Sequence, residues 1–331
     1  MHHEARALWF TAPRLVEIRS APLDTLKRGQ VQVRTTHSGM SPGTEMLAYR
    51  GQLDPDLPLD ETIGALGGTF RYPFQYGYSA VGLVERSRGS LLPEGTQVFA
   101  FHPHQDRFAI DADDVMPIDG LDPREATLFP LVETAFQISL DTGLRPGQRA
   151  MVLGLGPVGA LTSVLLARRG VEVVSVDPLG WRRSVVSGLR ISGLTTLDPE
   201  SVSSSDWEPV PVVVEASGNP EAVGLGLGSL AHEGTLLVAS WFGNREIPLP
   251  LGKEFHRRRL TIASTQVSTI PKRLASQWDK DKRLRAVVAL MDDLPLSAFA
   301  THTFPFENAD DAYDAIDRRQ EGLIHAALEY D

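Results

Sequence analysis

The sequence of 331 residues contains no cysteine. Disulfide bonds and thiolate metal sites are therefore excluded, and the composition fits a reducing cytoplasm, where we expect the protein to act. The sequence also lacks any apolar run near the roughly 20 residues that a membrane-spanning helix requires. Its first residues lack the apolar core of a signal peptide. We therefore expect no membrane partner.

Basic residues are in the minority as well, with 32 lysines and arginines against 42 aspartates and glutamates and a formal net charge of −10. This balance argues against nucleic acid or an anionic membrane surface as a partner, because such partners are bound through basic patches. The length suffices for two domains with a hydrophobic core each. We expect a two-domain protein with a small-molecule substrate.

The stretch Met151–Gly159 combines a short apolar strand with a Gly-x-Gly-x-x-Gly turn, and the helix that follows is predicted to span Pro157–Arg169. Gly154 permits the tight turn, Gly156 lets the backbone approach a pyrophosphate, and Gly159 lets helix and strand pack closely. The free N–H groups and the dipole at the helix start attract phosphates, and proline suits the first helical position. The residues predicted to bind a dinucleotide here are Gly154, Leu155, Gly156, Pro157, Val158 and Gly159.

A second apolar strand, Val171–Val176, ends at Asp177, near the spacing expected for the acid that binds an adenosine ribose. A carboxylate there accepts hydrogen bonds from the ribose hydroxyls and repels a 2′-phosphate, which favours NAD(H). Arg182 and Arg183 oppose this preference, because a guanidinium pair can hold that phosphate. We predict NAD(H) as the preferred cofactor, with NADP(H) as the alternative.

Strand and helix patterns predict a mainly β part from Ala5 to Asp119, with one face of each strand packed on a barrel core. Beyond Met151 strands alternate with helices, which predicts a parallel, doubly wound α/β sheet with right-handed crossovers. The expected strands are Ala5–Phe10, Leu15–Ser20, Gln30–His37, Ser79–Arg86, Gln97–His102 and Arg107–Ile110, then Val171–Val176, Thr195–Leu197, Val210–Glu215, Thr235–Ser240 and Leu260–Ser264. The residues expected to line the cofactor crevice, at the carboxyl ends of the later strands, are Ala216, Ser217, Gly218, Ser240, Trp241 and Ser264.

The tail changes pattern again and is expected to return to the N-terminal part. We therefore predict three segments: 1–133 as a catalytic domain, 134–264 as the dinucleotide-binding domain and 265–331 as the return. The later elements expected are helices at Pro220–Ala231, Leu274–Met291 and Phe306–Ile316 and a strand at Ile324–Leu328.

Several motifs together resemble the medium-chain dehydrogenase/reductase superfamily. They are His37–Glu45 (His-Ser-Gly-Met-Ser-Pro-Gly-Thr-Glu), Tyr76–Glu85, Leu131–Ala135, Gly154–Gly159 and Val214–Gly218. Within the superfamily they resemble the branch of bacteriochlorophyllide dehydrogenase-like and threonine or polyol dehydrogenase-like proteins. The resemblance implies a GroES-like β-barrel catalytic domain, an inserted Rossmann NAD(P)-binding domain and a homodimer.

The sequence departs from the zinc-containing members at the metal ligands. Ser41 stands where they have cysteine, Tyr78 where they have histidine, and only an acid near the third ligand position, Glu133, is retained. A hydroxyl, a phenol and one carboxylate make a poor zinc site, so we expect no zinc.

A different metal site is the alternative, in which Glu133 and Glu45 combine with His102 or His104. Pro103 disfavours the regular strand that would place both histidines on one face. We therefore expect the two histidines to be a solvated pair in a turn.

Without a metal, alcohol oxidation needs another group to take the hydroxyl proton and to stabilise the oxygen. Tyr78 is the candidate donor to that oxygen, Glu133 the candidate base, and Ser41 and Thr44 candidate relays. The alternatives are packing for Tyr78, helix capping for Thr44 and Glu45, and for Glu133 a buried acid bonded to backbone N–H groups or to an arginine.

These features predict a zinc-independent NAD(H) oxidoreductase that acts on a secondary alcohol or ketone of a polar small molecule, such as a sugar, cyclitol or biosynthetic intermediate. One alternative is an NAD(P)H quinone or enoyl reductase. The other is a non-catalytic NAD(H)-binding protein. The long loop Asp54–Phe74, with its glycines and prolines, is expected to form a wall of the substrate pocket.

Overall fold

The computed structural model describes residues 4–203 and 208–331 and divides into two compact units. Unit 1 comprises Met1–Pro130 and Val288–Asp331, and unit 2 comprises Leu131–Val287. Residues 265–287 therefore belong to unit 2, whereas the sequence analysis assigned them to the return. The domain boundaries after residues 133 and 264 stay predictions.

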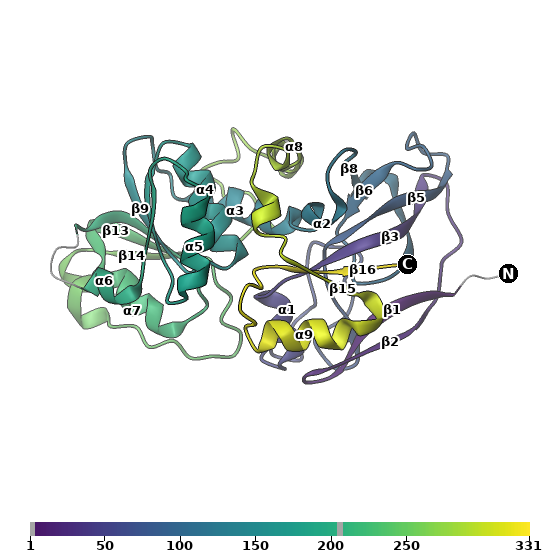
Figure 1. The fold of residues 1–331 in the computed structure, drawn as a ribbon, viewed down its shortest axis with the longest axis horizontal. Helices are drawn as coiled ribbons and strands as arrows, with labels where there is room; N and C mark the ends of the chain where they lie inside the picture. Colours follow the sequence, from purple (N-terminus) through teal and green to yellow (C-terminus); the bar gives the residue numbers. More distant parts are fainter. Residues whose placement is uncertain (1–3, 204–207) are drawn as a thin grey trace. The chain divides into compact units, whose positions relative to one another are not determined.

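Unit 1 is built on β-sheets (Figure 1). A seven-stranded sheet has the order β15-β16-β3-β5-β6-β8 with β7 also paired to β3, and a three-stranded sheet has the order β2-β1-β4. The C-terminal strand β16 pairs with β3, so the tail returns to the N-terminal part. The elements are β1 (Ala5–Ala12), β2 (Leu15–Ala21), β3 (Gln30–Met40), α1 (Thr44–Tyr49), β4 (Phe74–Gln75), β5 (Ala80–Arg88), β6 (Gln97–Ala100), β7 (Arg107–Asp111), β8 (Val115–Pro117), α2 (Pro123–Ala126), β15 (His302–Pro305), α9 (Ala309–Asp317) and β16 (Ala326–Glu329).

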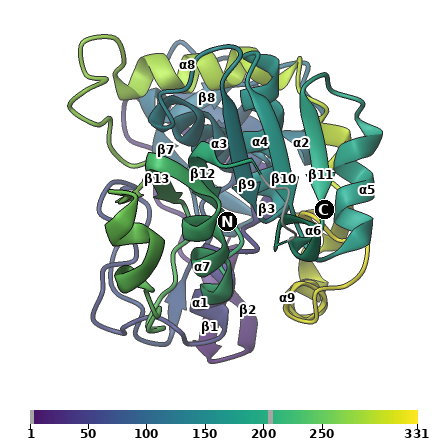
Figure 2. The same ribbon diagram turned by 90° about the vertical axis from the view of Figure 1, so that its left-hand side faces the viewer.

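Unit 2 contains a six-stranded sheet of order β11-β10-β9-β12-β13-β14, and every strand pair in it is parallel (Figure 2). Two further helices, α3 (Phe129–Asp141) and α8 (Lys280–Met291), cross the boundaries between the units. The other elements are β9 (Arg149–Leu153), α4 (Pro157–Arg168), β10 (Glu172–Val176), α5 (Gly180–Gly188), β11 (Leu194–Leu197), α6 (Pro199–Ser203), β12 (Val210–Glu215), α7 (Pro220–Gly228), β13 (Leu230–Val238), a single π-helical turn (Leu251–Phe255) and β14 (Thr261–Ser264).

Strand β9 shows why this sheet is covered on both faces. Successive side chains of a strand point to opposite faces, and those of β9 are apolar on both. Ala150 and Val152 lie in one buried cluster with residues of α3 and α4, while Met151 and Leu153 lie in another with residues of α7. The sheet is thus a doubly wound Rossmann sheet, and the predicted fold class is confirmed.

Some predicted elements have other limits in the structure. The helix predicted over Leu274–Met291 begins only at Lys280, because the Asp279 side chain accepts a hydrogen bond from the Lys282 N–H at 2.7 Å and caps the first turn. The helix predicted over Pro220–Ala231 ends at Gly228, and β13 starts two residues later. Strands β4, β8 and β15 and helix α5 were not predicted from the sequence, because they are too short or bury too few side chains to show a period.

Among the described residues, no helix combines the length and the apolar character needed to cross a bilayer.

Candidate active site and cofactor site

The glycine-rich turn of unit 2 has the backbone geometry that its motif predicts. Gly154 has φ of +94°, and a Cβ there would lie 2.6 Å from the Cα of Ser217. A Cβ on Gly159 would lie 1.9 Å from the carbonyl oxygen of Gly154. A Cβ on Gly156, in contrast, meets nothing within 4 Å. Two glycines are therefore required by packing, whereas the third leaves open space beside the helix.

The N-terminus of α4 fits a pyrophosphate. The helix begins at Pro157, its N-cap is Gly156, and no side chain caps it. The N–H groups of a first helical turn have no partner within the helix, and they form an anion site when no side chain takes them. With open space at the N-cap glycine, the turn fits the phosphates of a dinucleotide through the N–H groups of Val158 and Gly159, whereas the N–H of Leu155 is bonded to Asp177.

Asp177, directly after β10, is buried and holds the neighbouring backbone in place. Its Oδ2 accepts a hydrogen bond from the Leu155 N–H at 2.7 Å, and its Oδ1 accepts one from the Leu179 N–H at 2.8 Å. The Nη1 of Arg182 lies 3.6 Å from Oδ2. The acid that disfavours a 2′-phosphate and an arginine that could bind one therefore lie side by side after β10. The preference for NAD(H) stays a prediction.

A carboxylate that was not predicted from the sequence as a site residue, that of Glu215, holds the turn after β12. Glu215 is fully buried, and its Oε1 accepts hydrogen bonds from the N–H and Oγ of Ser217 at 2.8 and 2.7 Å. It also accepts one from the N–H of Gly218 at 3.0 Å, and the same N–H lies 2.9 Å from the Oγ of Ser240. The only sequence signal is an acid at the end of an apolar strand, before Ala-Ser-Gly.

The remaining residues predicted to line the crevice also lie at carboxyl ends of strands. Ala216 directly follows β12 and donates its N–H to the carbonyl of Leu153 at 2.8 Å. Ser264 ends β14 and pairs with Val238. Trp241 follows β13 and is 44% exposed. Their contacts with a cofactor stay predictions.

Three of the predicted catalytic side chains come together in unit 1. The phenolic hydroxyl of Tyr78 is hydrogen-bonded to the side chains of Ser41 and Thr44. Ser41 follows β3, Thr44 is the first residue of α1, and Tyr78 precedes β5. Burial, with a smaller contribution from the charge of Glu45, raises the pKa of Tyr78, so its hydroxyl keeps its proton at neutral pH and can donate it. We call these three residues the hydroxyl cluster.

Glu45 lies beside this cluster, fully buried, and takes part in a larger network. Its Oε1 accepts a hydrogen bond from the Ser41 N–H at 2.7 Å, and its Oε2 lies 2.9 Å from both the Tyr313 hydroxyl and the Nε2 of His104. The Nδ1 of His104 lies 2.6 Å from the Ser38 Oγ. Glu45 thus stabilises the turn before α1 and also links it to Tyr313 and His104, whereas we expected only a capping role.

The expectation of a solvated histidine pair is wrong for both residues. His104 is fully buried because Glu45 and Ser38 satisfy both of its ring nitrogens. His102 is also buried, with its ring stacked on that of Phe108 at a centroid distance of 3.7 Å. Its burial lowers the pKa of His102 to about 4.

The ring of Tyr78 packs in a cluster of aromatic side chains. Its ring meets that of Tyr76 edge-on at 6.1 Å, and Tyr76 in turn contacts Phe70 and Phe74. Phe74 stacks on Phe10 at 5.2 Å. Both interpretations of Tyr78 therefore have support, since the ring packs in an aromatic cluster and the hydroxyl lies in a polar one.

Glu133, in unit 2, is buried and bonded to an arginine, as one of its two interpretations expected. The Nε and Nη2 of Arg283 lie 3.0 and 2.8 Å from its Oε1. Burial raises the pKa of Glu133, and the charge and hydrogen bond of Arg283 oppose this rise. The sequence analysis missed Arg283, because a buried arginine in the charged stretch 278–283 looks like any solvated one. A role for Glu133 as catalytic base stays a prediction.

The residues at the superfamily's metal-ligand positions do not fit zinc. Ser41 and Tyr78 offer neutral hydroxyls, and Glu133 is already paired with a cation. In the described part of the chain, no three His, Cys, Asp or Glu side chains are grouped so that they could hold a metal ion. Glu45 and His104 do meet, but their further partners are hydroxyl and N–H groups.

A scan against models of known protein families gives no match. Among curated proteins, the chain is 26% identical to a 2-desacetyl-2-hydroxyethyl bacteriochlorophyllide A dehydrogenase of Cereibacter sphaeroides, over 93% of this chain and 92% of that protein. It is 27% identical to the L-galactonate-5-dehydrogenase of Escherichia coli, over 62% of this chain and 59% of that protein.

Several solved structures share the fold of this chain. The L-idonate 5-dehydrogenase of Escherichia coli superimposes with a TM-score of 0.80 at 14% identity, over 99% of each chain. An alcohol dehydrogenase of Escherichia coli in complex with NADH (TM-score 0.78, 14% identity, 98% of this chain and 99% of that one) shares the fold. So does TarJ of S. aureus in complex with NADPH (TM-score 0.74, 15% identity, 99% of each chain).

These relatives and the shared fold support the resemblance to the medium-chain dehydrogenase/reductase superfamily. The chain is an oxidoreductase of the alcohol dehydrogenase type, which interconverts alcohol and ketone groups. The resemblance found in the sequence is thereby confirmed.

Proposed function

We propose that this chain is a zinc-independent, NAD(H)-dependent oxidoreductase that interconverts a secondary alcohol and a ketone. The observation that carries the proposal is the hydroxyl cluster of Tyr78, Ser41 and Thr44. Two of its members, Ser41 and Tyr78, stand at positions where zinc members of the superfamily hold their metal. A protonated phenol can donate a hydrogen bond to a carbonyl or alkoxide oxygen, which is the stabilising role that a metal otherwise fills.

The chain's own part in the reaction is to handle the proton. When bound, the nicotinamide accepts a hydride from the alcohol carbon or delivers one to the carbonyl carbon. In the reducing direction the Tyr78 hydroxyl gives its proton to the substrate oxygen, and Ser41 and Thr44 return a proton to it from water. In the oxidising direction the same proton travels outward through the cluster.

The substrate is proposed to be a polar small molecule such as a sugar, cyclitol or biosynthetic intermediate. Support comes from the relatives, which include an L-galactonate-5-dehydrogenase and a D-guloside 3-dehydrogenase of Escherichia coli. NAD(H) is proposed as the preferred cofactor, because the carboxylate of Asp177 disfavours a 2′-phosphate at the end of β10.

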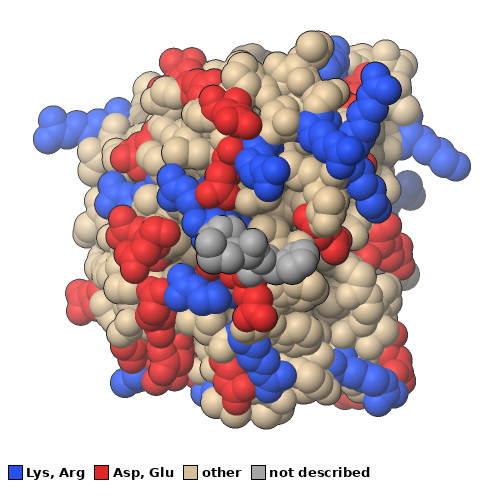
Figure 3. Space-filling view, turned by 90° about the vertical axis from the view of Figure 1, so that its right-hand side faces the viewer, with Lys and Arg blue, Asp and Glu red and all other residues tan. Residues whose placement is uncertain are grey.

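No nucleic-acid partner is proposed, and on the face drawn in Figure 3 lysine and arginine side chains are interspersed with acidic ones. We propose a homodimer that acts in the cytoplasm. Its support is β14, an edge strand of the unit 2 sheet, and the exposed apolar side chains Trp241, Leu249 and Leu251 of the same unit. A monomeric mass in light scattering would reject the dimer.

The proposal is tested by turnover of sorbitol, methyl glucosides and their ketone forms with NAD(H), in chelator-treated protein with the products identified. Tyr78→Phe removes the donor hydroxyl and keeps the ring, so we expect kcat to fall 100-fold or more with little change in thermal stability. Tyr76→Phe is the matched control and should keep its activity, because its hydroxyl is outside the hydroxyl cluster. Reduction of quinones or enones alone would favour the reductase alternative, and no turnover at all would favour a non-catalytic NAD(H)-binding protein.

A further inference from the structure

Arg283 is the largest of the fully buried side chains described in the protein, with a side-chain exposure of 1%. Its Nε and Nη2 contact Oε1 of Glu133 at 3.0 and 2.8 Å. Its Nη1 donates to Oε1 of Gln137 at 2.6 Å, and its Nη2 donates to the carbonyl of Val267 at 2.5 Å. Every nitrogen of the guanidinium therefore has an acceptor.

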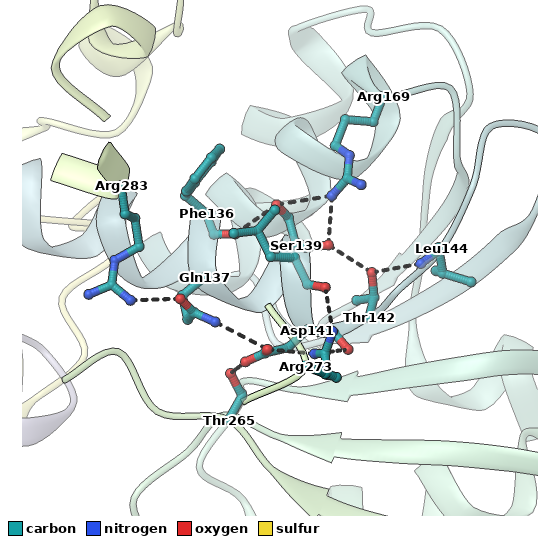
Figure 4. A network of polar contacts seen from close by, with 11 residues as sticks. Phe136, Gln137, Ser139, Asp141, Thr142, Leu144, Arg169, Thr265, Arg273 and Arg283 are labelled. Carbon is teal, nitrogen blue, oxygen red and sulfur yellow. Dashed lines mark hydrogen bonds and ion pairs between the residues drawn. The ribbon is translucent and has the colours of Figure 1, made fainter. Parts of the chain in front are cut away.

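These contacts belong to a polar stripe along one face of α3, formed by Glu133, Gln137 and Asp141 at intervals of four residues. Gln137 lies between Arg283 and Asp141 and donates to Oδ1 of Asp141 at 3.1 Å (Figure 4). Thr265 donates to Oδ2 of Asp141 at 2.6 Å. The segment that follows β14 is thus hydrogen-bonded along α3, and Arg283 lies at the buried end of the polar stripe.

Glu133 lies in the field of two cations, Arg283 and, at longer range, Lys280 on the same helix. Burial alone favours the neutral acid, and the two cations oppose it. Protonation of the carboxylate would leave the buried guanidinium without a counter-charge, which is strongly unfavourable in a protein interior. A metal dication at this carboxylate would lie close to the same fixed positive charge.

We propose that Arg283 is a positioning residue that keeps Glu133 a carboxylate at neutral pH and withdraws it from both proton transfer and metal binding. The assignment deepens the proposed function, because it leaves the hydroxyl cluster as the group that handles the substrate proton. Glu133 then serves the packing of α8 on α3 within unit 2, through the charge pair.

The first test is infrared difference spectroscopy of the full-length, cofactor-free protein between pH 8 and pH 6. If Glu133 stays ionised in wild type, the difference spectra of wild type and Glu133→Gln should contain the same protonated-carboxyl bands. Arg283→Met should gain such a band, and Arg283→Met/Glu133→Gln should lose it again. Arg273→Met is the matched control, since Arg273 is an exposed arginine that pairs with Asp141 at the other end of the same stripe, and it should gain no band.

A wild-type band that titrates in this range and disappears in Glu133→Gln would overturn the proposal. The comparison of wild type with Glu133→Gln needs no variant of Arg283, so the test holds even if Arg283→Met does not fold. Uptake of Zn²⁺ alone by wild type provides the second readout. One equivalent that is lost in Glu133→Gln would contradict the withdrawal from metal binding.

Urea unfolding gives a third readout. Each single variant should lower the unfolding midpoint, and the double variant should lose less than the sum of the two, because it leaves no unpaired charge. Additive losses would show that the two side chains are not coupled. None of these measurements requires turnover or cofactor binding, so failure of the proposed oxidoreductase activity would leave the assignment of Arg283 open to its own test.

Discussion

At the scale of single residues, the protein uses buried polar side chains whose protonation is set by their surroundings. Tyr78 keeps its proton because desolvation of its hydroxyl and the charge of Glu45 raise its pKa, and Glu133 is paired with Arg283. Two histidines are held neutral in the same way. Burial lowers the pKa of His102 to about 4 and that of His325 to about 3.

This burial predicts a loss of stability in mild acid. The folded pKa values lie below the unfolded value of about 6.5, so between those limits the unfolded state binds more protons. The contribution of the two histidines to the free energy of unfolding should therefore be fully present above pH 6.5. It should fall as the pH drops towards 4, by about 1.4 kcal/mol per pH unit for each histidine. Urea unfolding at pH 7 and pH 5.5 measures this slope. His102→Gln and His325→Gln should each reduce it, and an unchanged slope in both would contradict the assignment.

At the scale of elements, the glycines in the turn between β9 and α4 divide into one kind required by packing and another that leaves space for a ligand. Gly159 is held against the Gly154 carbonyl, whereas Gly156 faces open space. The motif was recognisable in the sequence because its spacing follows from local backbone geometry. The limits of α8 were not, because its start depends on the cap by Asp279.

The two glycines should respond differently to alanine. Gly159→Ala places a Cβ against backbone, and we expect a loss of about 3 kcal/mol in the free energy of unfolding. Gly156→Ala should keep the wild-type unfolding midpoint but bind NADH at least tenfold more weakly, because its methyl group takes space beside the phosphates. Denaturant unfolding and NADH titration of both variants check this. Equal effects on stability would contradict the division of roles.

At the scale of the whole molecule, the sequence predicted the α/β fold, the return of the tail and the alternation of strands and helices in the doubly wound sheet from period and spacing. It also predicted the hydroxyl cluster as candidates, although not that Ser41, Thr44 and Tyr78 touch. What it could not supply were partners distant in the chain. His104 lies 59 residues from Glu45, and Arg283 lies 150 residues from Glu133. Residue type alone cannot show whether such charged side chains are paired inside or solvated outside.

The central claim is a nicotinamide oxidoreductase whose chemistry does not use zinc. It is tested most directly by titrating NADH and NADPH into purified, chelator-treated protein, following nicotinamide fluorescence and measuring total metal in the same sample. We expect saturable NADH binding, at least tenfold tighter than NADPH binding, in protein with less than about one tenth of an equivalent of zinc. Stoichiometric zinc that survives the chelator, or tighter binding of NADPH, would contradict it.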